Sequence, residues 1–270
     1  MPIIYEPKGA AREYSPLACN LYLSCTHNCK YCYAPRALQR KAESYFCKPY
    51  PRRDILQKLE SELNKQTIDR QVLLSFIGDV YSDTEDDNHT TRRSLELFLA
   101  HNVPVAILTK GGERCLRDLD LFQKFGKSIH IGATLTFIDP EKSLLWESGA
   151  ARPAERLKAL KALKEHGVTT FASFEPVIEP EESLAMLDLS LRIGCVDIYK
   201  VGKLNNYQGL DKDVDWSDFL QKCVTSVRAA GKRLYVKKDL RMSAPGVELL
   251  PEESRPDLYC AGRQSTYTTK

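Results

Sequence analysis

Short apolar segments alternate with longer helical ones along most of the chain, and this alternation restricts the fold more than any other feature. The segments that fit strands are Leu17–Ser24, Val72–Ile77, Val105–Thr109, Ile129–Thr136, Val168–Phe174, Val196–Val201 and Leu234–Val236. The segments with a helical pattern are Arg53–Asn64, Thr91–His101, Arg114–Phe125, Pro153–His166, Pro180–Ile193 and Trp216–Ala230. Strands that alternate with helices form right-handed βαβ units around a parallel sheet. About six units fit, so we predict an α/β fold that is a partial (β/α)6 TIM-like barrel with parallel strands.

Length and composition set further limits. The chain has 270 residues, of which 43% are hydrophobic, so it can bury a large core. Because it shows no repeat or linker-like tract, we expect one domain over residues 1–270, with a core at about 15–237 and an extension at 238–270. No apolar run has the length of a membrane span, and the first residues do not resemble a secretory signal, so we expect a cytoplasmic protein without membrane contact.

The net charge is small, +3 from 39 basic and 36 acidic residues, and does not by itself indicate nucleic-acid binding. Basic side chains are concentrated in residues 36–53 and 232–241. Each cluster could contact a phosphate or a polynucleotide backbone, or be an ordinary solvated surface. Nucleic acid therefore stays an open partner that the charge does not favour.

Three of the nine cysteines stand close together directly after the first predicted strand. Cys25, Cys29 and Cys32 form a Cys-x3-Cys-x2-Cys motif, and loops after the strands carry the site in folds of this kind. Closely spaced thiolates favour iron–sulfur clusters or zinc. Structural zinc needs a fourth ligand, which Cys19 or His27 would have to supply. Three cysteines alone suit a [4Fe–4S] cluster whose fourth iron takes an external ligand, and we expect the other six to be free thiols.

With Tyr31 before its last cysteine, this motif resembles the signature of the radical S-adenosylmethionine (SAM) superfamily. The resemblance implies that Cys25, Cys29 and Cys32 hold a [4Fe–4S] cluster and that SAM binds its fourth iron. It also implies a radical SAM core fold, reductive cleavage of SAM to a 5′-deoxyadenosyl radical that abstracts hydrogen from a substrate, and a reductant such as flavodoxin or ferredoxin. A non-enzymatic electron carrier or structural metal module is the alternative from another class.

Further segments resemble one branch of that superfamily, which contains spore photoproduct lyase and DNA repair photolyase-like proteins. They cover roughly residues 12–182 in order and include Asn20-Leu21-Tyr22, Tyr33-Ala34-Pro35-Arg36, and residues 75–81, 107–110 and 131–136. Ile77 occupies the position of the cysteine that returns hydrogen in spore photoproduct lyase, so repair of DNA photoproducts is in doubt. Residues that could return hydrogen here are Tyr33, Tyr81, Tyr199 and Cys195.

The same resemblance implies residues that bind SAM. Gly78 and Asp79 would hold its methionine end, Lys110 its carboxylate, and Thr134 and Thr136 its ribose or carboxylate, while Tyr31 and Tyr33 flank the last cluster cysteine. Each has a plainer interpretation. Asp79 suits a turn, Lys110 a strand-end surface, the threonines an ordinary strand and the tyrosines simple packing.

Residues 171–209 diverge from the branch pattern and are expected to select the substrate. Glu175 directly follows the end of a predicted strand. Tyr199 and Lys200 lie in the next predicted strand, and Lys203 comes just after it. A carboxylate with amides and aromatic rings suits a heterocycle, and lysines suit a phosphate. Glu175 could instead cap the helix near Pro180, and residues 200–207 could be an ordinary polar loop.

These residues complete the functional hypothesis. We predict a lyase that acts on a small nucleobase or nucleoside, for example a 7-deazaguanine base such as queuine, with Glu175, Lys200, Lys203 and Tyr199 as catalytic residues. Repair or modification of polymeric DNA or RNA is the alternative.

Overall fold

The predicted strands pair side by side in the order in which they occur in the sequence. The structure is a computed structural model and describes residues 2–82, 89–204 and 213–262. Its one sheet consists of β1 (Ile4–Tyr5), β2 (Leu17–Cys19), β3 (Val72–Leu74), β4 (Val105–Thr109), β5 (Ile129–Thr134), β6 (Thr169–Val177), β7 (Ile198–Lys203) and β8 (Arg233–Val236). Only β1 is antiparallel, to β2, and all later neighbours are parallel. The predicted partial barrel with parallel strands is confirmed, with β1 and β8 as the edges of the described sheet.

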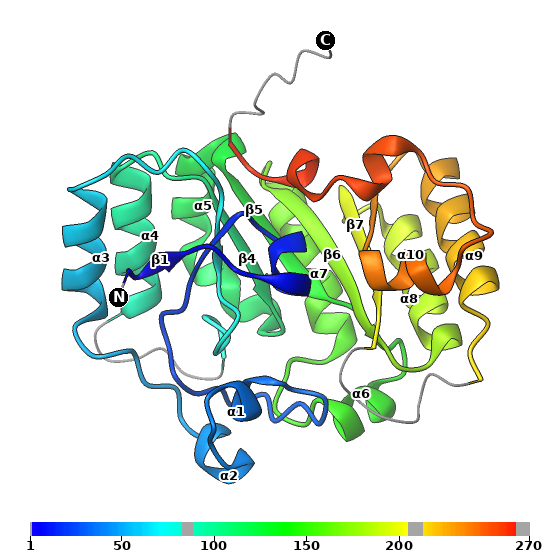
Figure 1. Cartoon of the computed structure of the whole chain (residues 1–270), viewed down its shortest axis with the longest axis horizontal. Coiled ribbons are helices and arrows are strands. Elements are labelled where there is room, and N and C mark those ends of the chain that lie inside the picture. Colours follow the sequence, from blue (N-terminus) through cyan, green and yellow to red (C-terminus); the bar gives the residue numbers. More distant parts are fainter. Residues whose placement is uncertain (1, 83–88, 205–212, 263–270) are drawn as a thin grey trace.

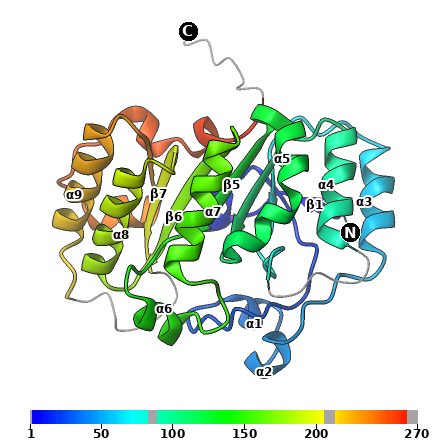
Figure 2. The same cartoon turned by 180° about the vertical axis from the view of Figure 1, so that it is seen from behind.

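Helices cover the outside of this curved sheet (Figures 1 and 2). The predicted ones are α3 (Ile55–Leu63), α4 (Thr90–Ala100), α5 (Leu119–Phe125), α7 (Pro153–Glu165), α8 (Pro180–Ile193) and α9 (Trp216–Ala229). The helix expected from residue 114 instead begins as a 3-10 helix, η2 (Gly112–Asp118). Among the described residues, no helix has the length and apolar character needed to cross a membrane.

Four helices were not expected from the sequence: α1 (Ala34–Ala37), α2 (Ala42–Tyr45), α6 (Pro140–Trp146) and α10 (Lys238–Ser243). Each has seven residues or fewer, too few to show a helical period. A local signal was nevertheless present for α6, because Asp139 accepts hydrogen bonds from the backbone of Glu141 and Lys142 and Pro140 is the first helical residue. Figure 1 shows α1, α2 and α6 together at the carboxyl ends of the strands.

The two terminal parts of the chain cover the opposite end and the open side of the barrel. The 3-10 helix η1 (Gly9–Glu13) reaches β8, where Glu13 accepts hydrogen bonds from the Tyr235 hydroxyl at 2.5 Å and from the Lys238 backbone at 2.9 Å. The last described segment contains η4 (Pro251–Ser254) and η5 (Pro256–Tyr259) and crosses the amino ends of the strands (Figure 1). The carboxyl ends remain open for a site.

Gln71 fastens both terminal segments to the start of β3. Its buried side chain donates to the Tyr14 carbonyl at 3.3 Å and to Ser15 Oγ at 3.1 Å, and it accepts from the Ala261 backbone at 2.7 Å. Replacing it leaves buried polar groups without partners. We therefore expect Gln71→Ala to lower the free energy of unfolding by about 2–4 kcal/mol in urea titrations. The exposed Gln66→Ala should change it by less than about 0.5 kcal/mol, and equal effects of the two variants would contradict this role.

Candidate functional site

A cavity of about 400 Å³ lies at the carboxyl ends of the strands. Its wall includes all three cysteines of the motif, Cys25, Cys29 and Cys32, together with residues from the ends of β3, β4, β5 and β6. The loop after β2 therefore faces the same space as the later strands. This is where the βα loops of barrel enzymes carry their chemistry.

The three cysteines suit a cluster better than a single ion. Burial raises the pKa of the Cys25 and Cys29 thiols to about 12, so binding must supply the charge that stabilises their thiolates. In the described part of the chain, no three His, Cys, Asp or Glu side chains are grouped closely enough for one metal ion. Ligands of zinc must all come within about 2.3 Å of the same ion, whereas each cysteine of a [4Fe–4S] cluster binds its own iron.

The extra ligands that zinc would need are engaged elsewhere. Cys19 is fully buried in the sheet core. His27 Nε2 lies 2.8 Å from Asp79 Oδ2 and His27 Nδ1 lies 3.2 Å from the Gly149 carbonyl. Three cysteines facing one cavity thus fit an iron–sulfur cluster with an open position.

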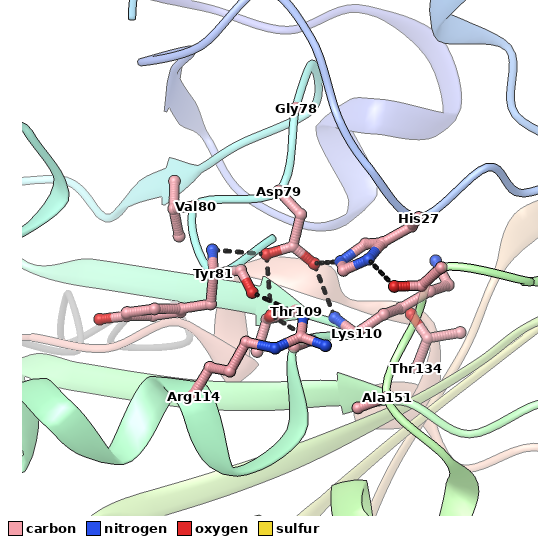
Figure 3. Close-up of polar contacts among 12 residues, drawn as sticks. His27, Gly78, Asp79, Val80, Tyr81, Thr109, Lys110, Arg114, Thr134 and Ala151 are labelled. Carbon is pink, nitrogen blue, oxygen red and sulfur yellow. Dashed lines mark hydrogen bonds and ion pairs between the residues drawn. The ribbon is translucent and has the colours of Figure 1, made fainter. Parts of the chain in front are cut away.

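Asp79 joins the cysteine loop to two strand ends (Figure 3). Its Oδ2 accepts hydrogen bonds from His27 and from the Lys110 backbone at 2.7 Å, and its Oδ1 accepts from Thr109 Oγ1 and from the Tyr81 backbone, both at 2.8 Å. Burial alone would raise the pKa of Asp79, but His27 and these backbone donors lower it below its usual value. Asp79 lines the cavity, and its carboxylate also makes the turn contact that the plainer interpretation predicted.

Gly78 lies where two chain segments cross. Its φ is +75°, and a Cβ added there would lie 2.8 Å from the Ser24 carbonyl, immediately before Cys25. Its backbone N–H donates to the Tyr45 hydroxyl at 3.0 Å. Gly78 therefore allows the loop after β3 to pack directly against the cysteine loop.

Lys110 lines the cavity, with Nζ 5.5 Å from the centre of the Tyr31 ring. Burial would lower the pKa of Lys110, but the nearby Cys29 and Glu147 raise it. Its Nζ makes no ion pair with a carboxylate in the described residues. A cation in this position is available to an anionic group in the cavity.

Tyr31 is held by a buried ion pair that sequence reasoning did not assign to the site. Its hydroxyl donates to Glu147, and Glu147 Oε2 lies 2.5 Å from Arg156. Arg156 also donates to the carbonyls of Ala151 and Thr134 at 2.8 and 3.0 Å. Removing one member of such a pair leaves an uncompensated buried charge, so this group fixes the wall formed by Tyr31 and β5.

The other residues expected to bind SAM are divided. Thr134 and Tyr33 line the cavity, and the Tyr33 hydroxyl donates to the Phe76 carbonyl at 3.0 Å. Thr136 does not line it. Its buried Oγ1 has no hydrogen-bond partner among the described residues.

Glu175 faces the cavity, as predicted, and forms a buried polar group. Its carboxylate lies 2.6 Å from Lys237 Nζ and 2.5 Å from the Tyr14 hydroxyl, which also contacts Ser173 Oγ at 2.6 Å. Burial and the charge of Glu175 raise the pKa of Tyr14, so the phenol remains a donor. Glu175 does not cap α8, whose N-cap is Glu179.

Sequence reasoning missed Tyr14, and it counted Lys237 only as part of a basic cluster. The alternation of the strands was an available signal for Lys237, since it follows the inward-facing Tyr235 by two residues.

The structure separates the residues expected from β7. Tyr199 packs under α8, where its hydroxyl contacts Ser190 Oγ at 3.2 Å, and Lys203 Nζ lies 3.3 Å from Ser243 Oγ, above Trp216. Neither lines the cavity, because alternate strand residues face the helices. Lys200 points into the barrel but lies below the cavity, with Nζ 3.3 Å from the Tyr14 carbonyl. Residues 205–207 of the predicted substrate loop lie outside the described residues.

Comparisons with known proteins agree with this architecture. A family model described as the radical SAM superfamily matches residues 19–192. An uncharacterized protein of Methanocaldococcus jannaschii is 30% identical over 165 residues, which are 59% of this chain and 59% of that protein. One of Acidianus two-tailed virus is 25% identical over 190 residues, 66% of this chain and 61% of that protein. The chain thus spans less than two thirds of the length of these curated relatives.

Solved structures share the fold at low sequence identity. Spore photoproduct lyase matches with a TM-score of 0.62 and 13% identity over 86% of this chain and 78% of that chain. Streptococcus suis SuiB bound to S-adenosylmethionine matches with a TM-score of 0.60 and 14% identity over 86% of this chain and 53% of that chain.

The tight crossing at Gly78 predicts a specific loss of metal binding. Gly78→Ala should push the loop after β3 away from Ser24 and lower the iron bound per chain after anaerobic reconstitution, while far-UV circular dichroism stays unchanged. Gly167→Ala is the matched control, because Gly167 has a similar φ of +78° and open space around its Cβ position. Both variants carry a backbone cost of about 1 kcal/mol. Equal iron contents would show that the crossing does not position the cysteines.

The burial of Lys200 predicts that the free energy of unfolding depends on pH. Burial lowers the pKa of Lys200 from 10.5 to about 8, so between these values the unfolded chain binds more protons and stability rises with pH. Below pH 8, the burial of the protonated amine costs on the order of 3 kcal/mol. We expect Lys200→Met to be most favourable relative to the wild type at pH 7 and to lose that advantage by pH 10.5 in urea titrations. A Lys200→Met difference that does not change with pH would contradict the prediction.

Proposed function

Since this chain belongs to the radical SAM superfamily, we propose that it is a radical SAM lyase that acts on a small nucleobase or nucleoside. Membership makes it an enzyme that uses a [4Fe–4S] cluster and SAM. When bound, the reduced cluster and SAM supply the 5′-deoxyadenosyl radical that starts the reaction. Lyase chemistry, the nucleobase substrate, the cytoplasm as its location and flavodoxin or ferredoxin as reductant belong to the proposal.

Three cysteines and the residues facing them are proposed to hold the cofactors. Cys25, Cys29 and Cys32 would bind the cluster, and Lys110 would pair with the SAM carboxylate. Support for Lys110 comes from its place on the cavity wall and from the lack of a carboxylate partner in the described residues. A charged hydrogen bond between an ammonium and a carboxylate is stronger than one between neutral groups.

Asp79 has a different proposed role from the one its position suggested. Both of its oxygens already accept two hydrogen bonds from the chain. We therefore assign it to positioning the cysteine loop and the Lys110 backbone, with Thr134, Tyr31 and Tyr33 completing the wall around SAM.

The group of Glu175, Lys237 and Tyr14 is the observation that carries the substrate proposal. These residues come from β6, from the end of β8 and from the N-terminal segment, and they meet on the cavity wall. Together they offer a carboxylate, an ammonium and a phenol, which suit the donors and acceptors on the edge of a heterocycle. Lys237 is buried and holds the carboxylate in place, so the group is preorganised.

The decisive experiment is a substrate panel under anaerobic conditions. Reconstituted protein with dithionite and SAM is mixed with free bases, including 7-deazaguanines, with nucleosides and with oligonucleotides. We expect a base or nucleoside to stimulate formation of 5′-deoxyadenosine and to transfer deuterium into it. Cys29→Ala should abolish this. Stimulation only by oligonucleotides would establish the polymer alternative, and no 5′-deoxyadenosine under any condition would refute the proposed enzyme.

Glu175 is tested with the substrate that the panel identifies. We expect Glu175→Gln to lower kcat/KM about 10- to 100-fold, the loss of one charged hydrogen bond, and to leave slow substrate-independent cleavage of SAM unchanged. Glu179→Gln, at the start of α8 and away from the cavity, should behave as the wild type. Equal rates for both variants would remove Glu175 from the substrate site.

A further inference from the structure

The cysteine loop has an outer face as well as an inner one. Cys29 and Cys32 line the cavity and also a second hollow. The second hollow is formed by the loop after β2 together with α1 and α2, which project from the body of the molecule in both views (Figures 1 and 2). Cys29 and Cys32 can therefore be approached from this hollow as well as from the cavity.

The rim of this hollow is basic. Lys30, Arg36 and Arg40 line it, and exposed Lys41 follows at the start of α2. In the described part of the chain, none of these four side chains forms an ion pair with a carboxylate. Glu43 is the one acidic residue between positions 36 and 53. Unpaired cations around a concave surface produce a positive potential that attracts an acidic partner and speeds its association.

We propose that this basic hollow, defined by Lys30, Arg36, Arg40 and Lys41, is the docking surface for an acidic one-electron carrier protein of the flavodoxin or ferredoxin type. The docked reduced carrier passes one electron to the oxidised cluster through the Cys29 and Cys32 side of the loop. The carrier is oxidised by one electron, the cluster is reduced by one, and the transfer needs no proton. The inference requires the cluster but does not depend on the nucleobase substrate.

Size and position favour a carrier over a polynucleotide. The hollow is confined to residues 28–46, which form the cysteine loop and the segment that contains α1 and α2, and transient electron-transfer complexes have small interfaces. A polynucleotide would use a longer basic track. The other basic cluster does not continue this surface, because Lys232 and Arg233 lie at the amino end of β8, away from the cysteine loop, and Lys237 is buried against Glu175.

The test compares two reductants of very different size. The variant is Arg36→Glu with Lys41→Glu, which leaves the cysteines and their neighbours in sequence unchanged. Flavodoxin hydroquinone must dock, whereas dithionite needs no protein surface. Cluster reduction is measured by stopped-flow absorbance without substrate. At low salt, we expect the variant to slow reduction by flavodoxin about 10-fold and to leave reduction by dithionite unchanged. High salt should reduce the difference, because it screens the charges.

Binding supplies a readout that does not depend on the loaded enzyme. Cluster-free protein titrated with oxidised flavodoxin should bind at least several-fold more weakly in the variant. The matched control is Lys65→Glu with Lys127→Glu, the same change in charge at exposed positions near the amino ends of the strands, and it should bind as the wild type.

Three results would overturn the inference. They are equal flavodoxin rates for variant and wild type, an equal loss with dithionite, or oligonucleotide binding at this surface that flavodoxin does not displace. If no compound of the substrate panel is active but the variant still slows reduction by flavodoxin, the proposed substrate is rejected and the proposed docking surface is retained.

Discussion

The carboxylate of Asp79 is the interaction on which the arrangement of the site depends. It accepts hydrogen bonds from the cysteine loop through His27, from the end of β4 through Thr109 and Lys110, and from the turn that follows it. The cysteine loop itself has no regular secondary structure between β2 and α1, so its position relative to the sheet must come from such contacts. Gly78, immediately before Asp79, allows the close approach that brings the carboxylate into reach.

Most of the fold was predictable because its elements are repeated and periodic. The strand and helix segments alternate at lengths that suit βαβ units, and each predicted strand overlaps an observed one, although β6, β7 and β8 extend beyond the predicted bounds. The elements that were missed are short. One is β1, and the others are α1, α2, α6 and α10, whose conformations depend on neighbours distant in sequence. For example, Lys30 in the cysteine loop donates from its backbone to the Trp146 carbonyl at the end of α6, a contact that no local pattern indicates.

Site residues could be predicted where the spacing of a sequence motif identifies them. They could not be predicted where their role depends on the direction in which a side chain points. The three cysteines, Gly78, Asp79, Lys110 and Thr134 all lie on one cavity wall. Tyr199 and Lys203 do not line this wall, because strand alternation places them on the opposite face from Lys200. Tyr14 could not have been found, since it is 161 residues away from Glu175 in sequence and reaches the cavity through the open side of the barrel.

The carboxylates on the cavity wall and directly behind it have fixed partners within the chain. Glu147 is paired with Arg156 and Glu175 with Lys237, and Asp79 accepts hydrogen bonds from His27, Thr109 and two backbone N–H groups. Lys110 lies beside these groups without a carboxylate within ion-pair distance in the described residues. Lys110 is partly buried on the cavity wall, so an anionic group in the cavity would give this cation a partner. The carboxylate of the methionine end of SAM is such a group, so the charge of Lys110 is compatible with the cofactor that the family uses.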